Sequence, residues 1–389
     1  MSQLLESRWS ETKDALLEGL QGNKRTVMAT TLENTRKYLS ESATAGATSA
    51  GNVATLNRVI LPVIRRVMPT VIANELVGVQ PMTGPVGQIH TLRVRYSDTF
   101  SGSTGGSTTA GDEALSPFKI AEGYSGAVTG KPAATAALEG VAGNKLSIQI
   151  LKQTVEAKSR KLSARWTFEA AQDAQAQQGI DIEAEIMAAL AQEITAEIDQ
   201  EILTSLATLA GTNNLIAWNQ TQVSGVATFV GDEHASLAVA INRVANTIAQ
   251  RTRRGAGNWA VVSPTALTIL QSATTSAFAR TTEGTFEAPT NTKFVGTLNS
   301  AMKVYVNTYA ANDDVLIGYK GQNESDAAAF FAPYIPLMSS GVVLDPNTFE
   351  PTCSFLTRYG YVELTNSSSS LGNAADYLGK VTVAQASFF

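Results

Sequence analysis

We predict an α+β fold for this chain, with a projecting hairpin, a long helix and a mixed α/β lobe. Two segments alternate apolar and polar residues as half-buried strands do, namely Gln88 to Tyr96 (QIHTLRVRY) and Lys145 to Lys152 (KLSIQILK). A third segment, Asp181 to Leu203, has an apolar residue at every fourth position, which is typical of a helix. Helical and strand patterns alternate further along the chain, so both kinds of element are expected in one lobe.

The N-terminal residues predict a short amphipathic helix on a tether. Apolar residues recur there near helical spacing, with acidic residues between them. These are Leu5, Trp9, Leu16 and Leu20. The stretch 40–52 is small and polar, which predicts a flexible connection. Because a tethered helix must bury its apolar stripe on a partner, we expect it to reach another subunit.

The next part of the chain predicts broken helical pieces and then an arm. Residues 53–79 have a helical apolar pattern that Pro62 and Pro69 interrupt. Residues 97–144, between the two alternating strands, are rich in Gly, Ser, Thr and Ala. Such a stretch is too poor in apolar residues to build its own core, so we expect a long hairpin that projects from the body.

The segment from Asp181 to Leu203 predicts a helical spine. Its apolar residues recur every four positions while the helix turns every 3.6, so the apolar stripe winds around the rod and meets different neighbours. At about 1.5 Å per residue the rod is roughly 35 Å long.

A mixed α/β lobe follows. We expect helices over residues 236–252 and 264–273, with strands at 258–264 and 302–309. The chain then ends in apolar, β-rich stretches, which lie around residues 315–319, 327–331 and 353–364.

The composition predicts a folded subunit of an oligomer. Apolar residues make up 44% of the chain, but charged residues only 16%, which is below the usual quarter. A surface with so few charges favours coverage by neighbouring subunits. The net charge of -5 argues against a tight grip on nucleic acid, which needs clustered Lys and Arg. The single cysteine, Cys353, is expected to be a small buried residue, and neither a secretory signal nor a membrane span is predicted.

Three glutamates on the predicted spine raise the possibility of a metal site. Glu193, Glu197 and Glu201 share one helical face, but carboxylate-bridged metal sites need a Glu-x-x-His partner. Neither His90 nor His234 has a glutamate three residues before it. We therefore interpret the glutamates as the polar face of an amphipathic helix, and we predict no metal ligand, cofactor or catalytic residue.

Other candidate motifs also favour structural roles. Gly126 to Pro132 (GAVTGKP) resembles a phosphate loop, but its glycine spacing is one residue short and Pro132 replaces the hydroxyl residue, so we expect turn glycines. No nucleophile elbow is present, and His90 and His234 are expected to be surface or packing residues. The basic cluster Arg251 to Gly255 suits a helix end or a subunit contact. An enzyme is therefore not predicted.

Five segments, in the same order over most of the chain, resemble the major capsid proteins of T-even-type tailed phages. They are RRVMPTVIANELVGVQPMTGPVGQIHTLRVRY (65–96), SRKLSARWTFEAAQDAQAQQGIDIEAEI (159–186), TRRGAGNW (252–259), YKGQNESDAAAFFAPYIPL (319–337) and DPNTFEPTCSFLTRYGYVEL (345–364).

This resemblance implies a Hong Kong 97-type capsid fold and a division of the chain into five parts. These are an N-arm with leading helical segments (1–86), an E-loop arm (87–165), a peripheral domain with the spine helix (166–225), an axial domain (226–340), and return strands to the peripheral domain with a C-terminal tail (341–389).

The resemblance also implies a function and partners. It implies hexamers and pentamers that form an icosahedral or prolate shell around double-stranded DNA, in a virion assembled in the cytoplasm of the host bacterium. Portal and scaffold proteins are expected partners, as are decoration proteins, whereas neither a membrane nor sequence-specific DNA binding is expected. An encapsulin-type compartment and a related vertex protein remain alternatives. Relatives lose an N-terminal propeptide after Leu-x-Glu or Ile-x-Glu, a pattern that fits Leu4 to Glu6, Leu16 to Glu18 and Ile120 to Glu122.

Overall fold

The computed structural model describes most of the chain between residue 9 and residue 384. The described residues are 9, 13–45, 71–103, 106–112, 114, 121–139, 142–178, 181–211, 214–219, 230–252, 254–273, 278–280, 293–322, 326–345, 348, 350–364 and 374–384. The predicted helical pieces over 53–70 and the end of the predicted tether, residues 46–52, lie outside these ranges.

A four-stranded sheet forms one end of the body, in the order β1-β11-β12-β4. Its two long strands are β11 (Ala329–Leu344) and β12 (Pro351–Glu363), which pair antiparallel. The edge strands are β1 (Gly78–Val79) and β4 (Lys158–Arg165). Buried and half-buried residues alternate along β12 because successive side chains point to opposite faces of the sheet.

A seven-stranded mixed sheet forms the other end, in the order β5-β13-β10-β6-β9-β8-β7. Its strands are β5 (Leu215–Asn219), β6 (Trp259–Val262), β7 (Phe278–Arg280), β8 (Lys293–Leu298), β9 (Met302–Val306), β10 (Asp314–Gly318) and β13 (Leu378–Ala384). Two helices, α8 (Val230–Thr252) and α9 (Pro264–Ser272), pack on one face of it, and the turn η2 (Ala374–Tyr377) leads into β13.

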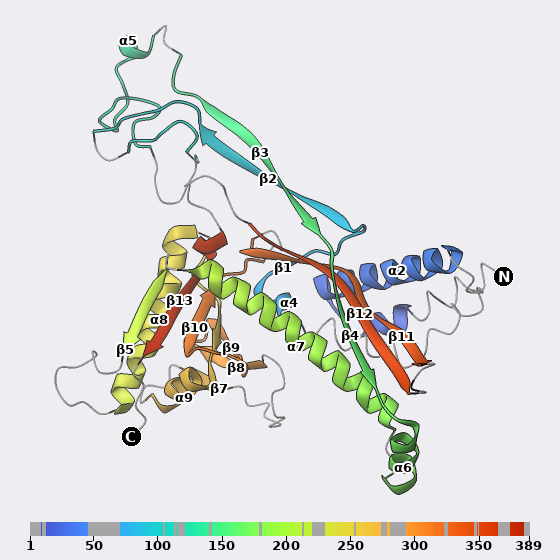
Figure 1. Cartoon of the computed structure of the whole chain (residues 1–389). Helices are drawn as coiled ribbons and strands as arrows, with labels where there is room; N and C mark the ends of the chain where they lie inside the picture. The colour runs from blue at the N-terminus through green and yellow to red at the C-terminus, as the bar shows by residue number, and fades with distance from the viewer. Residues whose placement is uncertain are drawn as a thin grey trace.

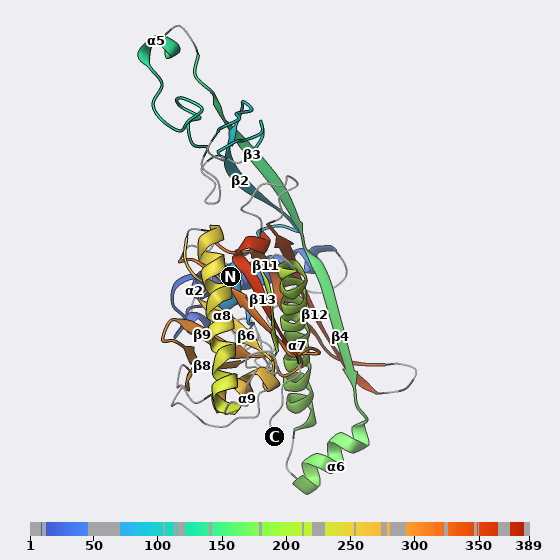
Figure 2. The same cartoon turned by 90° about the vertical axis from the view of Figure 1, so that its left-hand side faces the viewer.

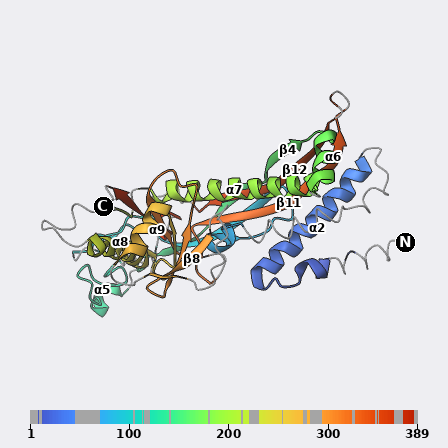
Figure 3. The same cartoon turned by 90° about the horizontal axis from the view of Figure 1, so that it is seen from below.

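The long helix α7 (Ile182–Ala210) lies between the two sheets and joins their cores (Figure 1). Asp181 caps its N-terminus, where the side chain accepts a hydrogen bond from the backbone N–H of Glu183 at 3.1 Å. Alternate residues of β6 face opposite ways, so Trp259 and Val261 join the α7 core, whereas Ala260 and Val262 join the α8 and α9 core. From below, α7 runs along the length of the body, with the short helix α6 (Phe168–Gln178) at its N-terminal end (Figure 3).

A two-stranded hairpin projects from this body (Figure 2). It consists of β2 (Val86–Tyr96) and β3 (Leu146–Glu156), antiparallel and in continuous register, with the short helix α5 (Thr135–Leu138) near its far end. The prediction of a long hairpin arm from the two alternating segments is therefore confirmed. The arm itself ends at Glu156, whereas β4, predicted within the arm, belongs to the four-stranded sheet.

The N-terminal residues pack on their own subunit, so the expectation that they reach another subunit is wrong for the described part. Leu16 and Leu17 are buried in the core that contains α7, and so are Val27, Met28 and Leu32. The last three lie on helix α2 (Gly22–Ala45), which lies against β11. The apolar stripe was predicted correctly, but its partner is the chain's own core.

The two sheets also divide the chain differently from the predicted domain limits. β11 begins at Ala329, inside the range 226–340 that was predicted as axial, and yet it belongs to the four-stranded sheet. β13 lies in the predicted return segment 341–389 but pairs with β5 and β10 in the seven-stranded sheet. Within the residues described, no helix has the length and apolar character that crossing a membrane requires.

Candidate assembly interface

The hairpin exposes one apolar face. Leu146, Ile148 and Ile150 are alternate residues of β3, and their exposed fractions are 54%, 69% and 66%. In the paired strand, Val94 lies opposite Ile148, but it packs against the small core at the arm tip, so the exposed part of this face belongs to β3. A two-stranded ribbon is only marginally stable by itself. An exposed apolar ladder on such a ribbon therefore indicates a surface that another molecule covers.

The free energy available at this face is large enough to matter. Full burial of one Leu or Ile side chain contributes about 1.5–3 kcal/mol. Scaled by the three exposed fractions, covering the face contributes at most about 3–6 kcal/mol per arm. The alternation predicted half-buried strands, but among the residues described nothing covers the side chains of Leu146, Ile148 and Ile150.

The far end of the arm has a small core of its own, contrary to the sequence expectation. Tyr96 and Tyr124 meet edge to face with ring centroids 4.6 Å apart, and Phe100 lies 5.9 Å from Tyr124. The Tyr124 hydroxyl donates to the Lys145 carbonyl at 2.7 Å, and the Lys145 N–H donates to Asp98 at 2.7 Å. Three aromatic rings among small residues are thus enough to order part of the tip, although the overall composition is poor in apolar residues.

Two of the three spine glutamates that raised the possibility of a metal site bind an arginine from the four-stranded sheet instead. Arg160 of β4 donates to Glu197 at 2.7 Å and to Glu201 at 2.6 Å, and its Nε donates to the Tyr359 hydroxyl at 2.6 Å. The Tyr359 hydroxyl in turn donates to Glu201. Burial raises the pKa of Glu201, but Tyr359 and Arg160 outweigh burial, so this pKa lies below its ordinary value.

This network changes the interpretation of the spine glutamates. Glu193 is exposed, as the polar-face interpretation expects, whereas Glu197 and Glu201 tie α7 to the four-stranded sheet. Among the residues that the structure describes, no cluster of three metal-ligating side chains occurs. The sequence could not reveal Arg160 as the partner, because it lies 41 residues before Glu201 with no local pattern linking them.

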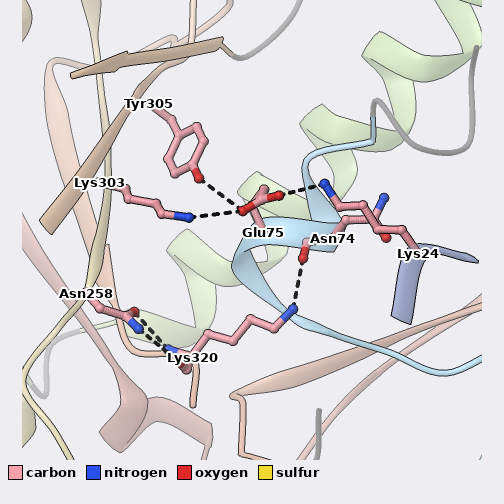
Figure 4. A network of polar contacts seen from close by, with 7 residues as sticks. All are labelled: Lys24, Asn74, Glu75, Asn258, Lys303, Tyr305 and Lys320. Carbon is pink, nitrogen blue, oxygen red and sulfur yellow. Dashed lines mark hydrogen bonds and ion pairs between the residues drawn. The ribbon is translucent and has the colours of Figure 1, made fainter. Parts of the chain in front are cut away.

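A second polar joint connects the residues leading into the arm with the seven-stranded sheet (Figure 4). Glu75, on the short helix α4 (Ala73–Leu76), accepts from Lys24 of α2 at 2.7 Å, and it pairs with Lys303 of β9 at 3.5 Å. Burial raises the pKa of Glu75, but the two lysines outweigh burial and hold this pKa below its ordinary value. Lys320 donates to the Asn74 carbonyl at 2.9 Å beside it.

The spine also carries one buried carboxyl group. Asp199 is 1% exposed and accepts from the Ile72 N–H at 2.9 Å, just before α4. Its Oδ2 has no hydrogen-bond partner in the part of the chain that is described. Burial raises the pKa of Asp199 to about 7, which outweighs the contribution of the Ile72 N–H. Asp199 was not among the residues singled out from the sequence, although its position among isoleucines already indicated a buried carboxyl group.

The remaining predicted motifs lie apart from one another. Gly126 to Pro132 forms turns at the arm tip, where the Ala127 N–H donates to the Lys131 carbonyl at 2.9 Å, so the prediction of turn glycines is confirmed. His90 is exposed on β2, whereas His234 is buried on α8, where its Nδ1 lies 2.6 Å from the Ser272 Oγ.

The basic cluster and the cysteine have structural positions. Arg251 pairs with Asp376 at 3.2 Å and Arg254 with Asp326 at 3.1 Å, both within the chain. These contacts agree with the structural role predicted for the cluster. Cys353 is fully buried in the core around α7, as predicted.

Comparisons with known proteins give consistent relatives. Residues 53–383 match the family described as Major capsid protein Gp23. The major capsid protein of Vibrio phage KVP40 is 30% identical, with 84% of this chain and 80% of the relative aligned. That of Enterobacteria phage T4 is 28% identical, with 83% and 78% aligned.

Solved phage structures also align over most of the chain. A chain from Mycobacterium phage Bobi has a TM-score of 0.49 at 13% identity, covering 81% of this chain and 90% of that one. The capsid of Myoviridae phage XM1 has a TM-score of 0.45 at 11% identity, covering 79% and 89%. Because these TM-scores are below 0.5, the family assignment depends on the sequence matches.

Proposed function

The chain belongs to the Gp23 family of major capsid proteins, and from this premise we propose that its hairpin arm binds a second copy of the chain in the assembled shell. As a member of this family it is a structural shell protein of a tailed phage and not an enzyme. The proposal concerns which surface of the subunit makes the contact and which residues bury it.

One observation carries the proposal, namely the uncovered apolar face of the arm. Leu146, Ile148 and Ile150 are exposed in the single subunit, on a ribbon that extends away from the body. Since the protein assembles with itself, the partner present at the highest local concentration is another copy. Stable assemblies of this kind bury roughly 2,000–5,000 Å² per interface, so the arm supplies one of several contacts.

The arrangement of copies is the finer part of the proposal. Head-to-tail contacts between subunits close into rings, which we propose are hexamers and pentamers. The arms would then tie each subunit to its neighbour, and the closed shell would hold double-stranded DNA. A net charge of -5 disfavours tight electrostatic binding to the phosphates, so the shell would confine the DNA rather than grip it. Portal, scaffold and decoration proteins are proposed partners on the same premise.

The alternatives are less favoured. An encapsulin-type compartment and a vertex protein use related shells, but the matched family and the curated relatives described above are major capsid proteins. Enzyme cargo in purified particles, or restriction of this chain to the shell corners, would favour one of these alternatives.

The test compares two neighbouring residues on opposite faces of β3. We expect Ile148→Asp to leave a folded subunit but to prevent stable shells, because the contact would bury an unpaired charge. Gln149→Asp places the same charge on the polar face and should still assemble. Circular dichroism measures the fold, and sedimentation with negative-stain electron microscopy measures the shells. Equal shell yields from the two variants would refute the proposed contact.

A further inference from the structure

One strand changes its pairing partner at the root of the arm. β3 pairs with β2 as far as Glu156, which lies opposite Val86. After the single residue Ala157, β4 begins at Lys158 and pairs with β12 of the body. The Ala157 N–H donates to the Pro85 carbonyl at 2.9 Å, which joins the two strands of the arm at the change. Ala157 is therefore the natural pivot of the arm.

A small apolar socket lies just beyond this pivot. Val155 of β3 is 3% exposed and packs with Met82 and Ala332. Gly360 of β12 faces it, and a Cβ added to Gly360 would overlap Val155 Cγ1 and lie 3.1 Å from the Glu156 carbonyl oxygen. Only a glycine at this position lets the arm approach the sheet so closely.

The other root of the arm is held from two sides. The N–H groups of Gln80 and Met82 donate to the carbonyls of Phe331 and Pro333 at 3.1 and 3.0 Å, which extends the pairing of β1 along β11. The side chain of Asn34 on α2 donates to the Met82 carbonyl at 2.7 Å and to the Tyr334 carbonyl at 3.0 Å. Asn34 is only 7% exposed, so this amide clamps the arm root and β11 together inside the protein.

We infer that Val155 and Gly360 are the positioning pair that sets the direction of the arm. Met82 packs against Val155, and Asn34 holds Met82 in place. Val155 is β-branched, and its short side chain has few alternative rotamers in a strand. The Glu156 carbonyl oxygen lies 3.1 Å from the added Cβ and needs to move by only a few tenths of an ångström, so the overlap with Val155 is the larger one. A side chain at position 360 must therefore push the strand rather than only a side chain.

The geometry makes the arm a lever. A Cβ added at position 360 would lie about 1 Å closer to Val155 Cγ1 than the usual 3.5–4 Å between two carbon atoms in contact. At about 3.3 Å per residue, Val155 is roughly 7 Å from the pivot at Ala157 and Leu146 is roughly 36 Å from it. A displacement of about 1 Å at the socket therefore moves the far end by about 5 Å.

The experiment measures the direction of the arm in unassembled subunits. Nitroxide labels are placed at Ala137→Cys near the tip and at Thr204→Cys on the exposed side of α7, and their separation is measured by pulsed electron paramagnetic resonance. The native Cys353 is buried and stays unlabelled. We expect Gly360→Ala to shift the separation by several ångströms. We expect Val155→Ala added to Gly360→Ala to restore it, because the smaller side chain leaves room for the new methyl group.

Two matched glycine variants serve as controls. Gly143→Ala lies on the arm with open space around its Cβ, and Gly318→Ala is a steric wedge against Trp259 in the seven-stranded sheet. Neither should change the separation, although the second lowers stability. An unchanged separation in Gly360→Ala, or a shift that the added Val155→Ala does not reverse, overturns the inference.

A second variant keeps the inference testable if Gly360→Ala does not fold. Asn34→Ala removes the hydrogen bonds of the clamp without adding atoms, so it should broaden the distribution of label separations. An unchanged width overturns the inference in that case.

The importance of arm direction for shell assembly rests on the proposed function. The label separation does not depend on the proposed function, because it is measured in unassembled subunits. A shifted arm with normal shells would therefore contradict the proposed contact and leave the positioning pair intact.

Discussion

Replacing Asp199 by asparagine should remove most of a pH dependence from the stability of the subunit. The carboxyl group is 1% exposed, and its pKa is raised from 3.8 to about 7. The folded state therefore holds its proton at pH values where the unfolded chain has lost it. The stability from this group is fully present below about pH 4 and is lost as the pH rises through about 7.

The magnitude follows from the shift. A change of about 3 pKa units corresponds to about 4 kcal/mol, at about 1.4 kcal/mol per unit. The natural subunit should thus lose up to about 4 kcal/mol of unfolding free energy between acid and alkaline pH through this group. The amide side chain of the Asp199→Asn variant would keep an oxygen that accepts from the Ile72 N–H and would carry no charge. The variant should therefore be the more stable form at pH 8.

The assay is urea unfolding of unassembled subunits at fixed concentration, from pH 5 to pH 9. A constant difference in unfolding free energy between the two proteins at low pH would report the unpaired N–H donors of the variant's amide side chain. The test is therefore the difference between the two proteins in the slope of unfolding free energy against pH. Glu75→Gln is the control of opposite sign. The pKa of Glu75 is lowered, so its charge contributes stability above its unfolded pKa, and this variant should be the weaker form at neutral pH. Parallel pH profiles for the natural protein and Asp199→Asn would refute the reasoning.

Three further predictions concern the core and the spine. Met28→Ala should cost the isolated subunit about 2–5 kcal/mol in urea unfolding, and an unchanged value would mean that α2 serves only a neighbour. Leu190→Asp should cost several kcal/mol, because Leu190 is 8% exposed in the same core, so its subunits should stay insoluble or unassembled in sedimentation. Glu201→Gln should lower the unfolding free energy by about 1 kcal/mol, whereas Glu193→Gln should leave it unchanged, and equal effects would contradict the Arg160 network.

The sequence predicted the elements whose pattern is local. The arm strands were expected at residues 88–96 and 145–152 and are found at Val86–Tyr96 and Leu146–Glu156. The spine was expected from Asp181 to Leu203 and runs from Ile182 to Ala210, ending where Gly211 adopts a positive φ of 46°. Alternation and helical spacing are properties of neighbouring residues, so a single sequence shows them directly.

What the sequence could not predict is which surfaces meet. An amphipathic stripe shows that Leu16 is buried, but not that its partner is the core around α7. Arg160 and Glu201 meet only because β4 lies beside the spine. The strand β13 was missed because its seven residues lie beyond the last apolar stretch that was recognised, and it pairs with β5, far away in the sequence.

The most direct test of the central claim is a cryo-electron-microscopy reconstruction of assembled particles, examined at the hairpin. The account predicts that Leu146, Ile148 and Ile150 lie against a neighbouring subunit and have lost the exposure they show in the single subunit. A reconstruction in which this face remains in solvent, or folds back onto its own subunit, would contradict it.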